Sequence, residues 1–402
     1  MGRNALYLVI GLSFLFLYRG LNFSRVSNDA FDNYLSYYKQ TVSHNIATSG
    51  ANIGANMVFE NPTWRGGYSN LSLSGGIFSL SVTDIGGGKI QLLAWSSYQG
   101  LNDTVTVIMQ PSSFSKYAYY TVNEGSVYWI TGDTVWGPVH TESRLNISGS
   151  PVFYGKVTAK NGTNPRKPAA KFYGGYQSGV SVPIQTDLSA LTNAASSTGI
   201  VFNSTDLWLT FNADGTVSYR TTAGGTDSTV ALSTFAPGGV ILVDKGNIHV
   251  KGTLNGKVTI GALSDHTGTT NGNVWIDDDI VYHKNPLVDP TSNDFLGIVS
   301  ENNVEITDNT PNLTDVNIMG TIYAANGSFT AQHYNTKAPS GTIYLLGGVT
   351  QNTRGPVGQF SGSTIINGYQ KNYKYDDRFL LKGNSPPAFP LTGQYEILSW
   401  RE

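Results

Sequence analysis

The 402-residue chain contains no cysteine, so it has no disulfide, no thiolate metal ligand and no cysteine nucleophile. Charged residues are also scarce, at 13% of the chain compared with about 25% in an average soluble protein. The formal net charge is −2 and no run of Lys or Arg occurs. The positive charge that neutralises nucleic-acid phosphates is therefore missing, and we expect no nucleic-acid partner.

Motifs that would indicate catalysis are missing as well. The sequence has no HExxH, no GxSxG and no Walker lysine motif. Its glycine triplet, residues 86–88, lies between predicted strands, whereas a phosphate-binding loop precedes a helix. The six histidines are scattered without a close pair: His44, His140, His249, His266, His283 and His333. We expect the chain not to be an enzyme and to need no cofactor.

What the sequence does contain, near its start, is a largely apolar run from Ala5 to Tyr18. As a helix it spans roughly 21 Å, and about 28 Å when extended through Arg19 to Phe23, close to the ~30 Å hydrocarbon core of a bilayer. We expect a retained helix that anchors the chain in a membrane or packs in a filament core. A cleaved signal peptide and a buried helix of a cytoplasmic domain are the alternatives. The predicted assembly residues of this run are Leu6, Leu8, Val9, Ile10, Leu12, Phe14, Leu15, Phe16 and Leu17.

The helix is predicted to continue, so that residues 1–57 form one hydrophobic anchor and assembly helix. Apolar residues from Phe31 to Met57 recur at spacings of 3, 4 or 7, which is the repeat of one helix face. The second half carries small residues, which allow another backbone to come close. We expect this face to pack on the chain's own sheet, on a second subunit, or on both. The predicted small-residue face comprises Ala47, Gly50, Ala51, Gly54 and Ala55.

Residues 58–133 are predicted to form a small antiparallel β-sheet. Short alternating runs, such as residues 77–82 and 89–95, are separated by glycine-rich turns, which is the pattern of a meander. One long helix followed by about four antiparallel strands indicates an α+β module with the helix across one face of the sheet.

Residues 134–367 show a different repeat. Apolar residues and glycines share one parity over long stretches, as in residues 145–157, 248–260 and 316–324. Small residues at a repeated inward position are typical of the tight corners of a β-solenoid, predicted here as a right-handed β-helix with an insertion at about 161–237. A two-sheet sandwich is the alternative. The predicted fold class is therefore mainly β with a long N-terminal α-helix.

The tail, residues 368–402, combines tyrosines with the proline-rich stretch Pro386–Pro390. Proline cannot donate a hydrogen bond within a central strand. We expect an ordered, extended strap that covers an open end or flank of the solenoid and shields its edge strands.

The acidic cluster Asp277-Asp278-Asp279 is the candidate for a metal site. Carboxylates are calcium ligands, and paired carboxylates can hydrolyse glycosidic bonds. Because neighbouring residues of a strand point to opposite faces, at least one of the three points away from the other two. We expect a solvated turn, and a calcium site is the alternative.

Several segments together resemble a known kind of protein. Residues 2–5 with the apolar helix and residues 46–51 are similar to the start of minor-pilin-like proteins of type IV pilus assembly, and residues 76–109 look like their small sheet. Further segments resemble uncharacterised bacterial envelope proteins with a pilin-type start and a solenoid-like C-terminal part; these are residues 137–141, 256–260, 296–298, 368–376, 386–390 and 399–400. The resemblance implies surface-filament or envelope biology and brings no catalytic residues. Type IV pilins usually carry a glutamate five residues after the processed glycine; counted from Gly2, this chain has Tyr7 there.

The sequence thus predicts a structural cell-surface protein, exported to the cell envelope. Its apolar helix would lie in membrane lipid before assembly and would then join copies of the chain in, or beside, an extracellular fimbrium-like filament. A membrane-anchored adhesin is the second hypothesis, with glycan bound by exposed aromatic residues such as Trp95, Trp129 and Trp136. A β-helix enzyme that cleaves polysaccharide with the three aspartates is the third.

Overall fold

The structure is a computed structural model that describes residues 2–265, 270–361, 364–381 and 384–402. Met1 and His266 lie outside the described residues. The chain is mainly β with one long N-terminal helix, as the sequence predicts. It divides into two compact units: unit 1 is Met1–Pro111 with Gln394–Glu402, and unit 2 is Ser112–Gly393.

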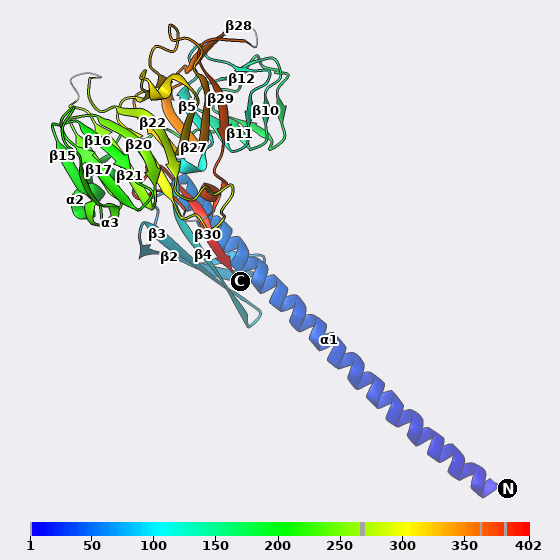
Figure 1. Ribbon diagram of the computed structural model, residues 1–402. Helices are drawn as coiled ribbons and strands as arrows, with labels where there is room; N and C mark the ends of the chain where they lie inside the picture. Colours follow the sequence, from blue (N-terminus) through cyan, green and yellow to red (C-terminus); the bar gives the residue numbers. More distant parts are fainter. Residues whose placement is uncertain (1, 266–269, 362–363, 382–383) are drawn as a thin grey trace. The chain divides into compact units, whose positions relative to one another are not determined.

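Unit 1 consists of one helix and one antiparallel sheet (Figure 1). Helix α1 spans Gly2–Glu60, three residues beyond its predicted end. The strands follow in the sheet order β1-β2-β3-β4-β30. Their bounds are β1 Tyr68–Leu73, β2 Gly76–Gly86, β3 Lys89–Tyr98, β4 Leu101–Ser113 and β30 Leu391–Arg401.

Two-residue turns set the register of this meander. Leu73 pairs with Gly76, so Ser74 and Gly75 form the turn, and both have positive φ, 51° and 80°. Gln99 and Gly100 join β3 to β4 in the same way, with φ of 47° and 84°. Positive φ at both central residues is the requirement of the type I′ turn, whose twist matches that of the strands it joins.

The C-terminal residues form a strand of the unit 1 sheet, whereas the sequence predicted a strap along the solenoid. Residues 391–401 form strand β30 beside β4 and are not a strap of the solenoid-like part. The side chains agree with this pairing, since Gln110 Nε2 donates to Glu396 Oε1 at 2.9 Å and Tyr395 Oη donates to the Gly88 carbonyl at 3.0 Å. The prolines that argued against a central strand precede β30, and β30 lies at an edge of the sheet.

The first half of unit 2 is built from short parallel strands. After the 3₁₀ turn η1 (Phe114–Lys116), ten strands alternate among three parallel groups: β5-β8-β11-β14, β6-β9-β12 and β7-β10-β13. Partners in neighbouring strands are about 18 to 20 residues apart, as in Val139↔Val157 and Val157↔Tyr176. The strands are β5 Tyr119–Asn123, β6 Trp129–Ile130, β7 Thr134–Val135, β8 Val139–Thr141, β9 Leu145–Ser148, β10 Val152–Phe153, β11 Val157–Ala159, β12 Thr163–Asn164, β13 Lys171–Phe172 and β14 Tyr176–Ser178.

The second half of unit 2 has longer strands, again paired mainly in parallel. One series runs β15-β19-β21-β23-β25-β27-β5 and another runs β16-β20-β22-β24-β26. Strand β29 continues from β27. The first elements are α2 Ser189–Thr198, β15 Ile200–Asn203, β16 Leu207–Phe211, β17 Thr216–Arg220, β18 Ser228–Ala231, α3 Leu232–Phe235, β19 Val240–Asp244 and β20 Ile248–Leu254. The others are β21 Lys257–Leu263, β22 Val274–Tyr282, β23 Phe295–Ser300, β24 Val304–Ile306, η2 Pro311–Leu313, β25 Val316–Ala324, β26 Phe329–Ala331, β27 Gly341–Thr353, β28 Gly358–Ser361, β29 Thr364–Lys374 and η3 Asp377–Leu380.

Part of the segment predicted as an insertion, residues 161–237, belongs to these parallel groups. Strand β14 pairs with β11, β15 with β19, and β16 with β20. The reason lies in the alternation of β16, where Leu207, Leu209 and Phe211 are buried and the residues between them are half-buried. The excursion from the repeat therefore consists of β17, which pairs antiparallel with β16, of β18, which pairs antiparallel with β17, and of helix α2.

Inward glycines occur where neighbouring strands approach closely. A Cβ on Gly252 (φ +105°) would lie 2.2 Å from the carbonyl oxygen of Phe211 on the neighbouring strand. At Gly347 (φ +151°) a Cβ would collide with the carbonyl oxygen of Gly320. These positions exclude any larger residue, which explains the repeated glycine register in the sequence.

Candidate functional site

The N-terminal half of α1 has no partner among the described residues of unit 1. Every described residue before Leu35 is exposed, and the apolar window of this helix is wholly unburied. In Figure 1 this half extends beyond the sheet on which the second half packs. By length and composition the helix could cross a membrane. The nine predicted assembly residues are all exposed, from 44% to 68%: Leu6, Leu8, Val9, Ile10, Leu12, Phe14, Leu15, Phe16 and Leu17.

The small-residue face of α1 lies elsewhere, against the helix's own sheet. Gly50 is in contact with the ring of Phe78, and Gly54 with the side chain of Leu80, both on β2. Three neighbours on the same face, Ala47, Ala51 and Ala55, are buried in the core of unit 1. Assigning these five residues to contacts between subunits therefore needs correction, because their surface is already covered within one chain.

Polar contacts hold the middle of α1 in place. The hydroxyls of Ser43 and Ser96 lie 2.9 Å apart in the buried interface, and Ser96 also donates to the Ser43 carbonyl at 2.6 Å. His44 Nδ1 lies 3.0 Å from Asp103 of β4. The second half of α1 is therefore held on the sheet by both apolar and polar contacts.

The three aspartates of the calcium candidate bind three different sets of partners. Asp277 lies 3.0 Å from Nδ1 of His249 and accepts from Oγ1 of Thr307 at 2.6 Å. Asp278 accepts from the backbone N–H of Asp279. The Asp279 carboxylate accepts from the backbone and side-chain amides of Asn317 at 2.7 and 2.9 Å. Within the described part of the chain, no group of three metal-ligating side chains is found.

A buried ion pair joins the two halves of unit 2, where β27 pairs with β5. Nη1 of Arg354 is 2.8 Å from Oε2 of Glu124, and both side chains are 2% exposed. The same guanidinium lies 4.1 Å from the centroid of the Trp129 ring and 5.4 Å from that of Tyr119. A planar guanidinium can bond to a carboxylate and lie over aromatic rings at the same time, and Arg354 makes both kinds of contact here.

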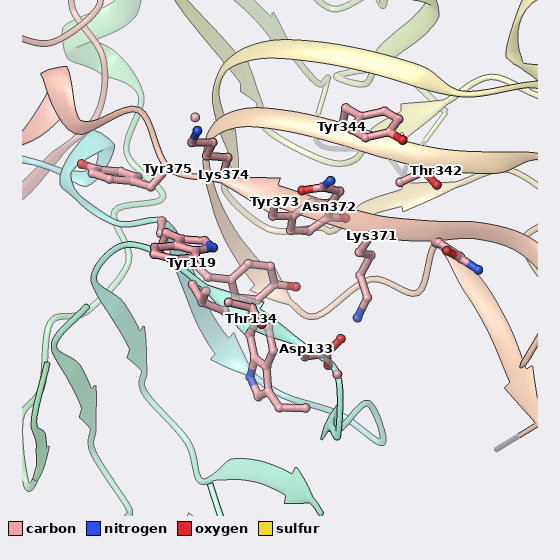
Figure 2. Close-up of a pocket in the computed structure, with 17 residues that line it drawn as sticks. Tyr119, Asp133, Thr134, Thr342, Tyr344, Lys371, Asn372, Tyr373, Lys374 and Tyr375 are labelled. Carbon is pink, nitrogen blue, oxygen red and sulfur yellow. The ribbon is translucent and has the colours of Figure 1, made fainter. Parts of the chain in front are cut away.

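Beside this ion pair is a cavity of about 370 Å³, shown in Figure 2. Strand β29 contributes Lys371 and Tyr373, and the segment around β7 contributes Asp133, Thr134 and Trp136. Burial lowers the pKa of Lys371 to about 8, with the nearby Asp133 opposing that shift. The Lys371 Nζ lies 5.8 Å from the centroid of the Trp129 ring. We name this the β7–β29 cavity.

An exposed stack of three aromatic rings begins at the edge of the β7–β29 cavity. Trp136, Tyr154 and Tyr173 are the residues that directly follow β7, β10 and β13, so parallel pairing brings them into line. The Trp136 and Tyr154 centroids are 4.1 Å apart with planes inclined by 11°, and those of Tyr154 and Tyr173 are 5.3 Å apart at 16°. Their exposed fractions are 54%, 42% and 65%.

The three tryptophans of the adhesin hypothesis have different surroundings. Trp95 is exposed on β3 of unit 1, Trp129 is buried beneath the β7–β29 cavity, and Trp136 is exposed at its edge. Sequence reasoning missed Lys371, whose partners lie far away in the chain. It also missed Tyr154 and Tyr173, although the recurrence of aromatic residues at the 18-to-19-residue interval of the repeat was a usable signal.

Residues 93–161 match a family model described as a domain of unknown function, DUF4900. No curated protein matches the chain. Among solved structures, the chain is similar to the competence-associated pilin ComZ from Thermus thermophilus, with 12% sequence identity and a TM-score of 0.42. That alignment covers 90% of this chain and 97% of the pilin.

Proposed function

We propose that this chain is a structural protein of the cell surface, a pilin-like subunit held by its N-terminal helix. One observation carries the proposal: a single helix has one half seated on an antiparallel sheet and the other half covered with exposed apolar side chains. That division is the arrangement expected of the pilin-type start that the sequence resembles. The exposed half is long enough for a bilayer core.

Burial of the apolar side chains in the N-terminal half of α1 is energetically favourable. Each large apolar side chain that leaves water contributes about 1.5–3 kcal/mol, so roughly eight of them supply more than ten kcal/mol before the entropy cost of association. Leu12 and Phe14, for example, are 45% and 68% exposed. The proposed partners are membrane lipid first and the same helix of other copies after assembly, which would place the protein in the cell envelope.

The role proposed for unit 2 is display and not catalysis. We propose that its parallel groups are the coils of a right-handed β-solenoid, because connections between parallel strands are right-handed in about 98% of cases. Coils of this kind form a stiff body whose loops and flanks can vary. The three aspartates are engaged with separate partners, so they give no support to the polysaccharide-cleaving hypothesis.

Removal of the helix's free half tests the assembly role. We expect a chain lacking residues 1–26 to leave the membrane fraction and to behave as a monomer in size-exclusion chromatography, whereas the full chain requires detergent or forms filaments. Negative-stain microscopy of material sheared from the cell surface provides the complementary view. A truncated protein that still forms fibres would refute the role given to α1.

The second candidate, a surface protein that binds glycan, is favoured by the β7–β29 cavity and its aromatic edge. It is compatible with the first, since a surface subunit can also carry a binding site.

A further inference from the structure

We propose that the β7–β29 cavity binds a neutral, hydroxyl-rich sugar unit of a polysaccharide. The site belongs to unit 2 alone and does not depend on how α1 assembles. Its volume of about 370 Å³ lies within the roughly 300–1,000 Å³ of known ligand pockets. Its lining combines aromatic rings with amide, hydroxyl, ammonium and carboxylate groups.

The base of the cavity is rigid. Trp129 and Tyr119 pack edge to face with centroids 5.0 Å apart, and Arg354 stacks on both rings while paired with Glu124. Tyr119 also accepts a hydrogen bond from Nε2 of Gln351 at 2.8 Å. Side chains held from several directions lose little freedom when a ligand binds, which lowers the cost of binding.

One charged pair in the cavity is left open to a ligand. Lys371 and Asp133 both line the cavity, as Figure 2 shows, yet no ion pair or hydrogen bond joins them among the described residues. One carboxylate oxygen of Asp133 accepts from the Ile130 N–H at 2.9 Å. A sugar hydroxyl can accept from the ammonium and donate to the carboxylate, and so bridge two groups that do not reach each other.

The charge balance favours a neutral ligand over an acidic one. The charges of Lys371 and Asp133 offset each other, and the Arg354–Glu124 pair below is also neutral as a whole. Lys374 lines the cavity but is exposed to solvent, where its charge is screened. A carboxylate-bearing sugar would be drawn to Lys371 but repelled by Asp133, so it would gain little.

The aromatic edge gives a surface for the apolar face of a sugar ring. Tyr154 covers one face of the Trp136 ring and does not line the cavity, whereas Trp136 does. Trp136 is thus the member of the aromatic stack that lines the cavity, and Tyr344 of β27, 42% exposed, lines it as well. Large rigid rings bury much apolar area at low entropy cost, while the ligand's hydroxyls reach the polar groups.

Binding is tested with the full chain in a detergent that has no sugar headgroup. Neutral oligosaccharides, oligouronates and a short extended peptide are titrated by calorimetry after a glycan array has selected the neutral sequences. We expect neutral oligosaccharides to bind and the other two probes to bind at least tenfold more weakly. Preferential binding of oligouronates or of the peptide would overturn the proposal, as would no binding of any neutral sugar on the array.

Matched variants locate the site. Trp136→Ala should weaken binding at least tenfold, whereas Trp95→Ala, which removes a similarly exposed tryptophan from unit 1, should leave it within twofold. Lys371→Met and Asp133→Asn should each weaken binding, and Lys171→Met on β13 serves as the control for lysine removal. Far-UV circular dichroism verifies that each variant is folded. If the cavity variants are folded and bind like the controls, the proposal is wrong, whatever the result of removing residues 1–26.

Discussion

The ring of Phe78 occupies the space that a side chain on Gly50 would need. A Cβ built on Gly50 would lie 2.6 Å from Cδ2 of Phe78, closer than real Cβ atoms come. Helix α1 thus packs on its own sheet so closely that Gly50 and Gly54 leave no room for a side chain. The small residues in the second half of α1 are explained by this contact within one chain.

Gly50→Ala should destabilise unit 1. Alanine favours a helix over glycine by about 1 kcal/mol, but overpacking against Phe78 costs typically 1–3 kcal/mol, so we expect a net loss of about 1 kcal/mol. The measurement is denaturant unfolding of the full chain in detergent. Gly20→Ala is the control, since nothing lies within 4 Å of a Cβ there. Equal stability of the two variants would contradict the close packing of Gly50 against Phe78.

Leu12→Lys should reduce retention in the membrane. A lysine at the centre of a membrane-spanning helix costs about 2.5–3.5 kcal/mol on the insertion scale, and Leu12 lies in the middle of the apolar run. We expect a larger share of the protein in the soluble fraction or in degraded form. Asn33→Lys, at an exposed position beyond the run, should leave the distribution unchanged. If both variants behave like the unchanged protein, the run is not held in lipid.

Glu142 should make the stability of unit 2 depend on pH in the acidic range. Burial alone would raise the pKa of Glu142, but hydrogen bonds from Lys160, the Val182 backbone, His140 and Ser181 outweigh it and lower the pKa to about 2. The pKa of Glu142 is lower in the folded than in the unfolded protein, so its carboxylate stabilises unit 2. This stabilisation is complete above about pH 4.5 and is lost as the pH falls toward 2.

Glu142→Gln is the variant that isolates this effect. A lowering of about two and a half pKa units corresponds to roughly 3 kcal/mol, so the variant should be less stable than the unchanged protein by up to about that amount at pH 7. The gap should narrow steadily between pH 4.5 and 2 in denaturant titrations. A gap that does not change with pH over this interval would show that ionisation of Glu142 is not its source.

Glu124→Gln should strongly destabilise unit 2, although the two side chains are nearly the same size. It leaves Arg354, 2% exposed, without its carboxylate partner, and breaking one side of a buried ion pair costs about 3–5 kcal/mol. The control is Asp227→Asn, which breaks the partly exposed pair with Arg220 at the same kind of distance, 2.9 Å. That change should cost less than about 1 kcal/mol. Similar losses of melting temperature in the two variants would contradict the burial argument.

Local pattern in the sequence was enough for the elements that depend on near neighbours. The apolar run and the meander with its glycine-rich turns both follow from spacing and turn residues. The fixed parity of the inward glycines was visible in the sequence, but the predicted location at tight corners was wrong. Gly252 and Gly320 lie within β20 and β25, where a neighbouring strand comes close.

Features that depend on distant parts of the chain could not be predicted. Strand β30 finds its partner in β4, nearly three hundred residues earlier, and nothing in its own sequence specifies that partner. Lys371 and Asp133 line the same cavity only because the fold brings β29 near β7. Composition likewise could not distinguish buried Trp129 from exposed Trp136, because the difference lies in their positions: Trp129 belongs to β6, whereas Trp136 directly follows β7.

The sheet of unit 1 has a topological property with practical value. The chain leaves this sheet after β4 and returns as β30, and these two strands are neighbours. Adjacent strands are about 5 Å apart, so the chain segment that connects β4 to β30 begins and ends at neighbouring points of the sheet. Another folded domain whose termini lie close together could replace this segment, and unit 1 would then display that domain.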